Sequence, residues 1–151
     1  MSEQAEPIFS IEKLYVKDLS LEVPNAPAIF LDQEGPSINV ELNNTVTTVS
    51  EGLYHVLLTV TVTAKREEKT YFLVEAGQAG IFQVRNVPQE NIEPILGITC
   101  PTILFPYVRE VISDAVNRAG FPPVLLAPVN FEAIYQQRLQ QATQQAPAQV
   151  Q

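Results

Sequence analysis

The chain has 151 residues and carries 17 Asp and Glu against 9 Lys and Arg, a formal net charge of -8. This length predicts one domain. The acidity argues against nucleic acid as a partner, because a nucleic-acid binder needs a basic surface that releases the counterions of the phosphates. Hydrophobic residues make up 46% of the sequence and charged residues 17%, so the chain can bury a core and still expose apolar surface.

The cellular location is predicted from features that the sequence lacks. The first residues resemble no secretory signal, and we find no apolar stretch of about 18 residues, so we expect no direct membrane insertion. The single cysteine, Cys100, has no partner for an internal disulfide and suits a reducing compartment. We therefore expect a soluble, cytoplasmic protein.

The first part of the chain predicts two strands with a long loop between them. Apolar residues alternate over 9–23 with shifts in phase, which predicts a strand that contains a bulge. A loop with two prolines follows and includes the apolar segment 28–31. Alternation over 38–42 then predicts a second strand, which we expect to end in a turn at Asn43-Asn44.

The clearest strand signal covers residues 54–62, where apolar residues alternate with His55 and threonines. A charged hairpin is expected at 65–69, followed by a returning strand over 70–76. Both faces of this last strand are partly apolar, with Tyr71, Leu73 and Glu75 on one and Phe72, Val74 and Ala76 on the other. We therefore expect both faces to be covered.

Two glycines that follow, Gly77 and Gly80, are expected to loosen the strand pairing. A short helix is then predicted over 89–96, stopped by Gly97. A longer helix is predicted over 101–119, with Gly120 as its C-terminal stop.

The longer helix is apolar beyond a single stripe, so we expect it to be buried on more than one side. Asn130 is a natural N-cap for a last helix. The Gln/Ala-rich segment 140–151 and the residues 1–7 have no core pattern, and both are expected to be disordered.

Strands followed by helices are typical of the α+β class, here a four-stranded antiparallel sheet with helices packed on one face. The core domain is expected to cover residues 8–139. A small sheet that is covered on one side leaves apolar surface exposed, which favours an oligomer.

Candidate catalytic residues are few. Cys100 and His55 are the only thiol and imidazole, and their positions give no support to a nucleophilic dyad. No Cys or His pair has metal-ligand spacing, and 77–80 is no phosphate loop. We therefore predict that the protein is not an enzyme and binds no metal or cofactor. The alternative hypothesis, from a different class of function, is an enzyme that uses Cys100.

Two features can serve either structure or binding. The apolar loop 28–31 either plugs the core or flanks a groove for extended apolar peptide. Asp18, Glu22 and Glu75 either form an acidic cluster on neighbouring strands or belong to an ordinary solvated face.

Five segments stand out along the chain: VKDLSLEVPNAP (16–27), VTVTA (60–64), AGIF (79–82), CPTILFPYVRE (100–110) and LAPVNFEAIY (126–135). In the same order and with nearly the same spacing, they make the sequence similar to the SecB family of bacterial protein-export chaperones. The resemblance runs from about Ile8 to Leu139.

The resemblance implies a homotetramer built as a dimer of dimers, with the long helices between the dimers. It implies an ATP-independent holdase that binds unfolded preproteins in the cytoplasm and delivers them to the motor ATPase SecA. The zinc of that partnership belongs to the motor, so no metal is expected here. The alternative is a general or antitoxin-linked holdase of the same fold.

Site residues follow from the resemblance by position. Residues expected to bind the motor are Asp18, Glu22, Leu73 and Glu75. Residues expected to bind clients are Ile29, Phe30, Leu31, Val40 and Leu42. Residues expected at a subunit interface are Val74, Ala76, Gln78, Val108 and Ile112. The loop 31–36 and the Gln/Ala-rich tail depart from the pattern of many members.

Overall fold

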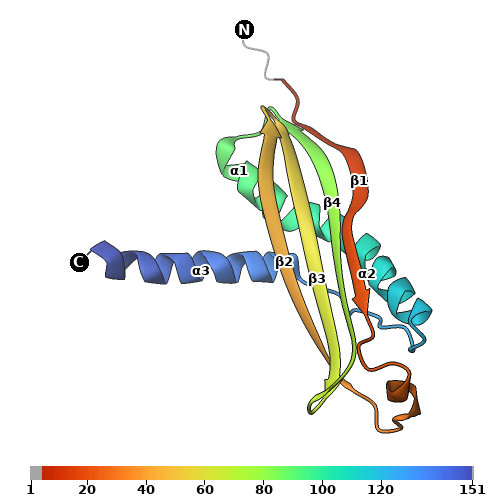
Figure 1. The fold of residues 1–151 in the computed structure, drawn as a ribbon. Helices are drawn as coiled ribbons and strands as arrows, with labels where there is room; N and C mark the ends of the chain where they lie inside the picture. The colour runs from red at the N-terminus through yellow and green to blue at the C-terminus, as the bar shows by residue number, and fades with distance from the viewer. Residues whose placement is uncertain (1–4, 151) are drawn as a thin grey trace.

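Four long strands form one antiparallel sheet in the order β1-β4-β3-β2, as Figure 1 shows. The computed structural model describes residues 5–150. The strands are β1 (Ile8–Glu22), β2 (Ser37–Ser50), β3 (Leu53–Arg66) and β4 (Lys69–Arg85). The predicted four-stranded antiparallel sheet is confirmed.

The phase shifts in the first strand correspond to two irregularities in its pairing with β4. The register shifts between Ile11 and Lys13 and again between Val16 and Asp18. Each extra residue reverses the alternation, so the apolar residues of all three phases point to the same face of the sheet. The bulge predicted in this strand is therefore confirmed, and it occurs twice.

Strands β2 and β4 are longer than predicted. The Asn43-Asn44 pair stays in the ladder, opposite Thr59 and Leu58, and the chain turns instead at Gly52, where φ is +72°. Gly77 and Gly80 also remain paired with both neighbouring strands. A Cβ at Gly77 would lie 3.1 Å from the Leu57 side chain. A glycine therefore occupies position 77 because the Leu57 side chain packs closely against it, and not because the pairing of the strands is interrupted there.

One nearly continuous helical segment follows the sheet. It comprises α1 (Gln89–Pro94), the π-helical turn η2 (Ile95–Thr99) and α2 (Cys100–Arg118). The predicted stop at Gly97 is wrong, because the helix continues through it. A Cβ there would lie 2.8 Å from Tyr135 Cδ1, so this glycine lets the last helix pack closely. Gly120, with φ of +97°, follows the end of α2 as predicted.

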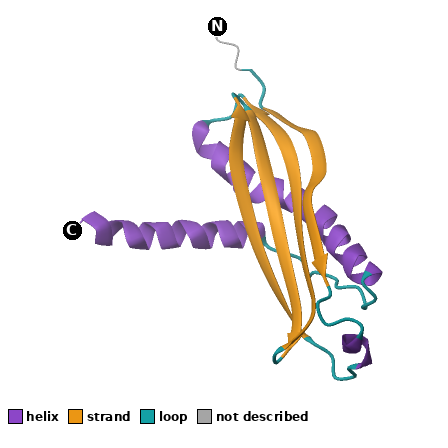
Figure 2. Cartoon of the chain, viewed as in Figure 1, coloured by secondary structure: helices purple, strands orange, loops and turns teal. Residues whose placement is uncertain are grey.

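The last helix, α3 (Phe131–Val150), begins where the sequence predicted. The Asn130 Oδ1 accepts a hydrogen bond from the Ala133 N–H at 3.0 Å, which confirms the N-cap. The helix continues to Val150 and so includes most of the Gln/Ala-rich segment. Residues 1–4 and 151 lie outside the described residues. Figure 2 shows α3 projecting away from the sheet.

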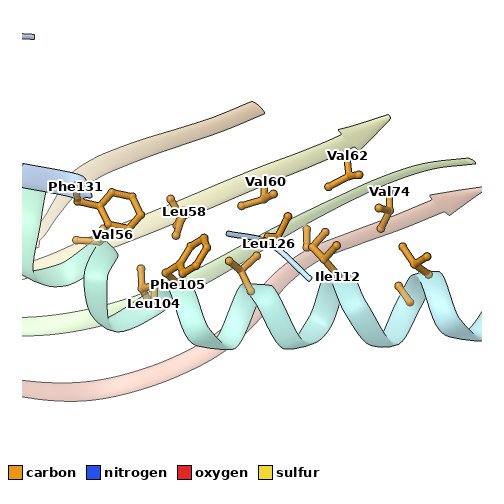
Figure 3. Close-up of a cluster of buried hydrophobic side chains, with 14 of the residues drawn as sticks. Val56, Leu58, Val60, Val62, Val74, Leu104, Phe105, Ile112, Leu126 and Phe131 are labelled. Carbon is orange, nitrogen blue, oxygen red and sulfur yellow. The ribbon is translucent and has the colours of Figure 1, made fainter. Parts of the chain in front are cut away.

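The core lies between α2 and one face of the sheet (Figure 3). Alternate residues of β3 are fully buried there, and they meet Leu104 and Ile112 of α2. On the opposite face Glu75 is exposed. Tyr107, on the far side of α2, is 48% exposed. The expectation that both faces of the last strand and several sides of the helix are covered is therefore not met within this chain, because its single long helix covers one face.

The five residues expected at a subunit interface belong to this intrachain core. Val74, Ala76, Gln78, Val108 and Ile112 are all buried. Side chains that are buried within one chain offer no surface to a second chain. The prediction is therefore corrected: these residues form the packing between the sheet and α2. A subunit interface has to use residues that are exposed in the single chain.

The helical stretch Gln89–Arg118 is long and apolar enough to cross a membrane by length and composition. The sequence expectation that no stretch reaches this level is thus corrected. A buried core helix passes the same test, and Leu104, Val108 and Ile112 of this stretch are buried against the sheet.

We predict that Gly97→Val destabilises the chain by about 2 kcal/mol, because the new side chain collides with the Tyr135 ring. Tyr135→Ala in the same chain should remove much of that cost, since it removes the obstacle. The free energies of unfolding of the two single variants and the double variant, from denaturant titration, measure this coupling. Strictly additive effects would contradict it.

Candidate functional site

A cavity of about 900 Å³ opens between the loop that follows β1, the first half of β2, and the segment between α2 and α3. We call it the groove. Four of the five residues expected to bind clients line it: Ile29, Phe30, Val40 and Leu42. The fifth, Leu31, is 83% exposed and does not line the groove. The apolar loop 28–31, folded as the 3-10 turn η1 (Ala28–Leu31), therefore both fills the core with Ile29 and walls the groove with Phe30.

The segment between the two long helices forms a wall of the groove that sequence reasoning did not identify. All ten residues of 120–129 line the cavity. Residues 119–131 contain no charged side chain and three prolines, and that composition was the available signal. The Phe121 ring stacks on Phe30 with centroids 5.0 Å apart and also lies 5.0 Å from Phe72. The aromatic contacts fix this segment beside the sheet.

Tyr71 also lines the groove, contrary to its predicted place beside Leu73 and Glu75. Ala64 pairs with Phe72 and Lys65 pairs with Thr70, so Tyr71 is an extra residue in β4. Such a bulge re-aims the side chain of the extra residue. Tyr71 is consequently only 3% exposed and lies 6.3 Å, centroid to centroid, from Phe121.

Asp32 places a carboxylate at the same end of the groove. Its Oδ1 accepts a hydrogen bond from the Glu34 N–H at 3.0 Å, and its Oδ2 lies 3.8 Å from Lys69 Nζ. The nearby Tyr71 hydroxyl, the Glu34 N–H and the cations Lys69 and Arg66 hold the pKa of Asp32 below its usual value. Burial, and then the Asp32 carboxylate, raise the pKa of Tyr71. Asp32 is thus an anion and Tyr71 a neutral phenol at pH 7.

A second, smaller cavity of about 440 Å³ continues along β2 under the start of α3. Leu42 lines both cavities. Asn44 donates a hydrogen bond from Nδ2 to the Leu96 carbonyl at 3.3 Å, which ties β2 to the helical layer at this point. The apolar surface that begins at Phe30 therefore extends along the strand.

The four residues expected to bind the motor lie together on the face of the sheet that α2 does not cover. Glu22 pairs with Leu73, and Glu75 and Asp18 follow at neighbouring positions of the same two strands, opposite Ser20 and Gly77. We call these four residues the acidic face. Asp18, Glu22 and Glu75 are exposed. Among the side chains that the structure describes, no basic group forms an ion pair with them, so their charge is available to a partner.

The protein-family model described as Preprotein translocase subunit SecB matches residues 2–142 of the chain. The chain belongs to the SecB family. It is 60% identical to a protein of Dechloromonas aromatica named Protein-export protein SecB, over 99% of this chain and 98% of that protein. A relative of the same name from Chromobacterium violaceum is 64% identical over 94% of this chain and 97% of that protein.

A solved structure also resembles the fold. It is a SecB-like chaperone of Mycobacterium tuberculosis in complex with a peptide of an antitoxin, with a TM-score of 0.66. The two chains are 18% identical, and the match covers 80% of this chain and 90% of the other. This likeness supports the SecB fold of the sheet and helices.

Cys100 and His55 do not meet in this SecB chain. Cys100 is fully buried in the core, where burial raises the pKa of its thiol to about 12. His55 lies on the opposite face of the sheet, where its Nε2 is 2.7 Å from the Tyr15 hydroxyl. The residues that the structure describes include no group of three or more His, Cys, Asp or Glu placed to hold a metal ion.

We predict that Cys100 resists alkylation in the native protein. With a pKa of about 12, only about one thiol in ten thousand is ionised at pH 8, and the thiolate is the reactive form. Iodoacetamide labelling followed by mass spectrometry should show modification in denaturant and almost none without it. Rapid labelling of the folded chain would contradict a buried thiol.

Proposed function

We propose that the chain is a cytoplasmic, ATP-independent holdase that binds unfolded preproteins, keeps them competent for export and delivers them to SecA. The groove is the observation that carries this proposal. Its walls are apolar, and residues that line it, such as Phe30 and Val40, keep part of their apolar surface exposed. An extended, unfolded segment with apolar side chains can bury them there.

Holding of this kind requires no chemistry. A protein that binds the unfolded form of a client and not its native form lowers the amount of client that can fold. Several weak contacts become strong when one client chain reaches several grooves, because the later contacts form at a high effective concentration. The second cavity along β2 supports such extended binding.

A homotetramer built as a dimer of dimers would supply several grooves. The exposed apolar residues of edge strand β1 support assembly through that strand, because an unpaired edge with apolar side chains favours pairing with another chain. Ile11, Val16 and Leu19 are all exposed there. We propose that these exposed residues make the subunit contacts, in place of the buried residues that the sequence had predicted at the interface.

Export, not antitoxin control, is the activity that the relatives favour. Proteins that are 60% and 64% identical are named for protein export. The acidic face supports SecA as the partner, since unpaired carboxylates on a flat, exposed sheet suit a cationic surface. The structure with the antitoxin peptide shares the fold at 18% identity.

We predict that the protein delays refolding of an unfolded preprotein and that Val40→Asp reduces this delay about tenfold, because it places a charge in the apolar groove. The matched control is Asn39→Asp, which adds the same charge one residue away on the other face of β2. Recovery of native client fluorescence measures both variants. Equal loss in the two variants, or no delay by the original protein, would overturn the proposal.

We predict that Glu75→Lys weakens binding to SecA about tenfold and leaves the refolding delay unchanged. The substitution reverses one charge on the acidic face, which lies on the opposite side of the sheet from the groove. Glu51→Lys makes the same change at the exposed β2–β3 turn and should have little effect. Calorimetric titration with SecA measures the affinities. A loss of both activities in Glu75→Lys would contradict separate surfaces.

A further inference from the structure

The loop between β1 and β2, residues 23–36, buries little apolar surface. The structure describes all of these residues, and only Ile29 among them is buried. Phe30 stacks on Phe121 but keeps part of its surface exposed, and Leu31 is exposed. A loop of this length loses much conformational entropy when it is fixed, and one buried side chain offsets only part of that loss. Polar contacts are therefore needed to dock the loop.

Polar side chains of the loop contact one short stretch of chain at the β3–β4 hairpin, residues 66–71. The contacts are Asn25 Nδ2 to the Thr70 carbonyl at 2.9 Å, Glu34 to Arg66 at 2.6 Å, and Asp32 to Lys69 at 3.8 Å and to the Tyr71 hydroxyl. The loop is thus held from the side of β4, while Phe30 faces the segment 120–129 across the end of the groove.

Burial separates these contacts by strength. The Glu34 and Arg66 side chains are exposed, and ion pairs that are open to water contribute little to stability. The Asp32 side chain is 10% exposed and Tyr71 is 3% exposed. A hydrogen bond from a buried hydroxyl to a carboxylate contributes more, because the loss of one partner leaves the other buried without water. Docking of the loop therefore depends most on the contact between Asp32 and Tyr71.

Local structure directs both members of this pair and links them to the groove wall. The β4 bulge turns Tyr71 into the groove. The Glu34 N–H donates to Asp32 Oδ1 at 3.0 Å, which orients the carboxylate. Asp32 is also the C-cap of η1, and its N–H donates to the Ile29 carbonyl at 3.2 Å. The position of Asp32 therefore sets the position of Phe30 in the same turn.

We propose that Asp32 and Tyr71 are positioning residues of the groove: their contact docks the loop 23–36 on β4 and keeps Phe30 in the groove wall before a client arrives. The inference rests on the proposed holdase function and adds that the groove is preformed. A client that meets a docked wall does not have to order the loop, so its apparent affinity is highest when the loop is docked all the time.

Amide hydrogen exchange in the absence of a client tests the positioning role. The Ile29 and Phe30 N–H groups donate hydrogen bonds within the loop at 2.9 and 3.1 Å, so their exchange reports opening of the loop. We expect Asp32→Ala to accelerate this exchange about tenfold and Tyr71→Phe about threefold. The double variant should exchange no faster than Asp32→Ala alone, because both substitutions remove the same contact.

Glu34→Ala is the matched control. It removes a carboxylate from the same loop and keeps the N–H that binds Asp32, and the ion pair that it breaks is exposed. Exchange should therefore stay close to that of the original protein. Thermal unfolding of each variant shows that it is folded, and Tyr71→Phe keeps the shape of the buried ring. Unchanged exchange in both Asp32→Ala and Tyr71→Phe would overturn the inference, and so would an equal acceleration in Glu34→Ala.

Client binding separates positioning from direct contact. The affinity of the full-length protein for a fluorescent unfolded client should fall about threefold in Asp32→Ala, because the loop is docked for a smaller fraction of the time. The bound client should slow the exchange of the Phe30 N–H again, since it holds the loop from the groove side. A loss of affinity without faster exchange in the free variant would show that Asp32 contacts the client itself, which contradicts a positioning role.

The two measurements also distinguish this inference from the function on which it rests. Exchange in the free protein requires no client. A protein that delays client refolding, and whose variants exchange like the original, overturns the positioning role alone. A protein that does not delay refolding overturns the holdase function, whatever the exchange rates of its loop are.

Discussion

Helix α2 packs along the middle of the sheet, against β3 and β4, and this contact decides what the other surfaces can do. A helix with its side chains is about 10–12 Å wide, whereas the outer strands of a four-stranded sheet lie about 14 Å apart, before their side chains are counted. One helix therefore buries the two central strands and leaves the outer two uncovered on the same face. The apolar side chains of β2 then line the groove, and those of β1 are exposed at the edge.

The two faces of the sheet are consequently different in character. The face toward α2 carries the core in its centre and apolar surface on both flanks. The other face carries the carboxylates of Asp18, Glu22 and Glu75, and β3 contributes threonines to it. The groove runs along β2 on the helix side of the sheet, whereas the acidic face lies on the other side of the sheet, on β1 and β4, so the two surfaces share no side chain.

Bulges do much to arrange these surfaces. The two irregularities in β1 keep the alternating apolar residues from Phe9 to Leu21 on the helix side, although the sequence pattern changes phase twice. The bulge in β4 moves Tyr71 out of the polar face and into the groove. A strand of 15 or 17 residues accumulates twist and would lose its register with a flat partner, and extra residues adjust it locally.

The sequence by itself determined the class of fold, the four strands, the start of the last helix at Asn130 and the stop at Gly120. These features depend on alternation, caps and turn residues, which are local. The sequence did not decide whether Asp18 and Glu22 lie beside Leu73 and Glu75, which follows from the pairing of β1 with β4. Only the tertiary structure decided where Gly97, Tyr71 and residues 120–129 act. The sequence pattern at Gly97 is typical of a helix stop, but the glycine is needed because the Tyr135 ring packs on it. Tyr71 lies on the other face of β4 because of a bulge that arises only when the strands pair. The segment 120–129 forms a wall of the groove because Phe121 stacks on Phe30. Val74, Val108 and Ile112 lie in the core of the chain and not at an interface. Periodicity shows which face of a strand or helix is apolar, but only the tertiary packing shows what covers that face.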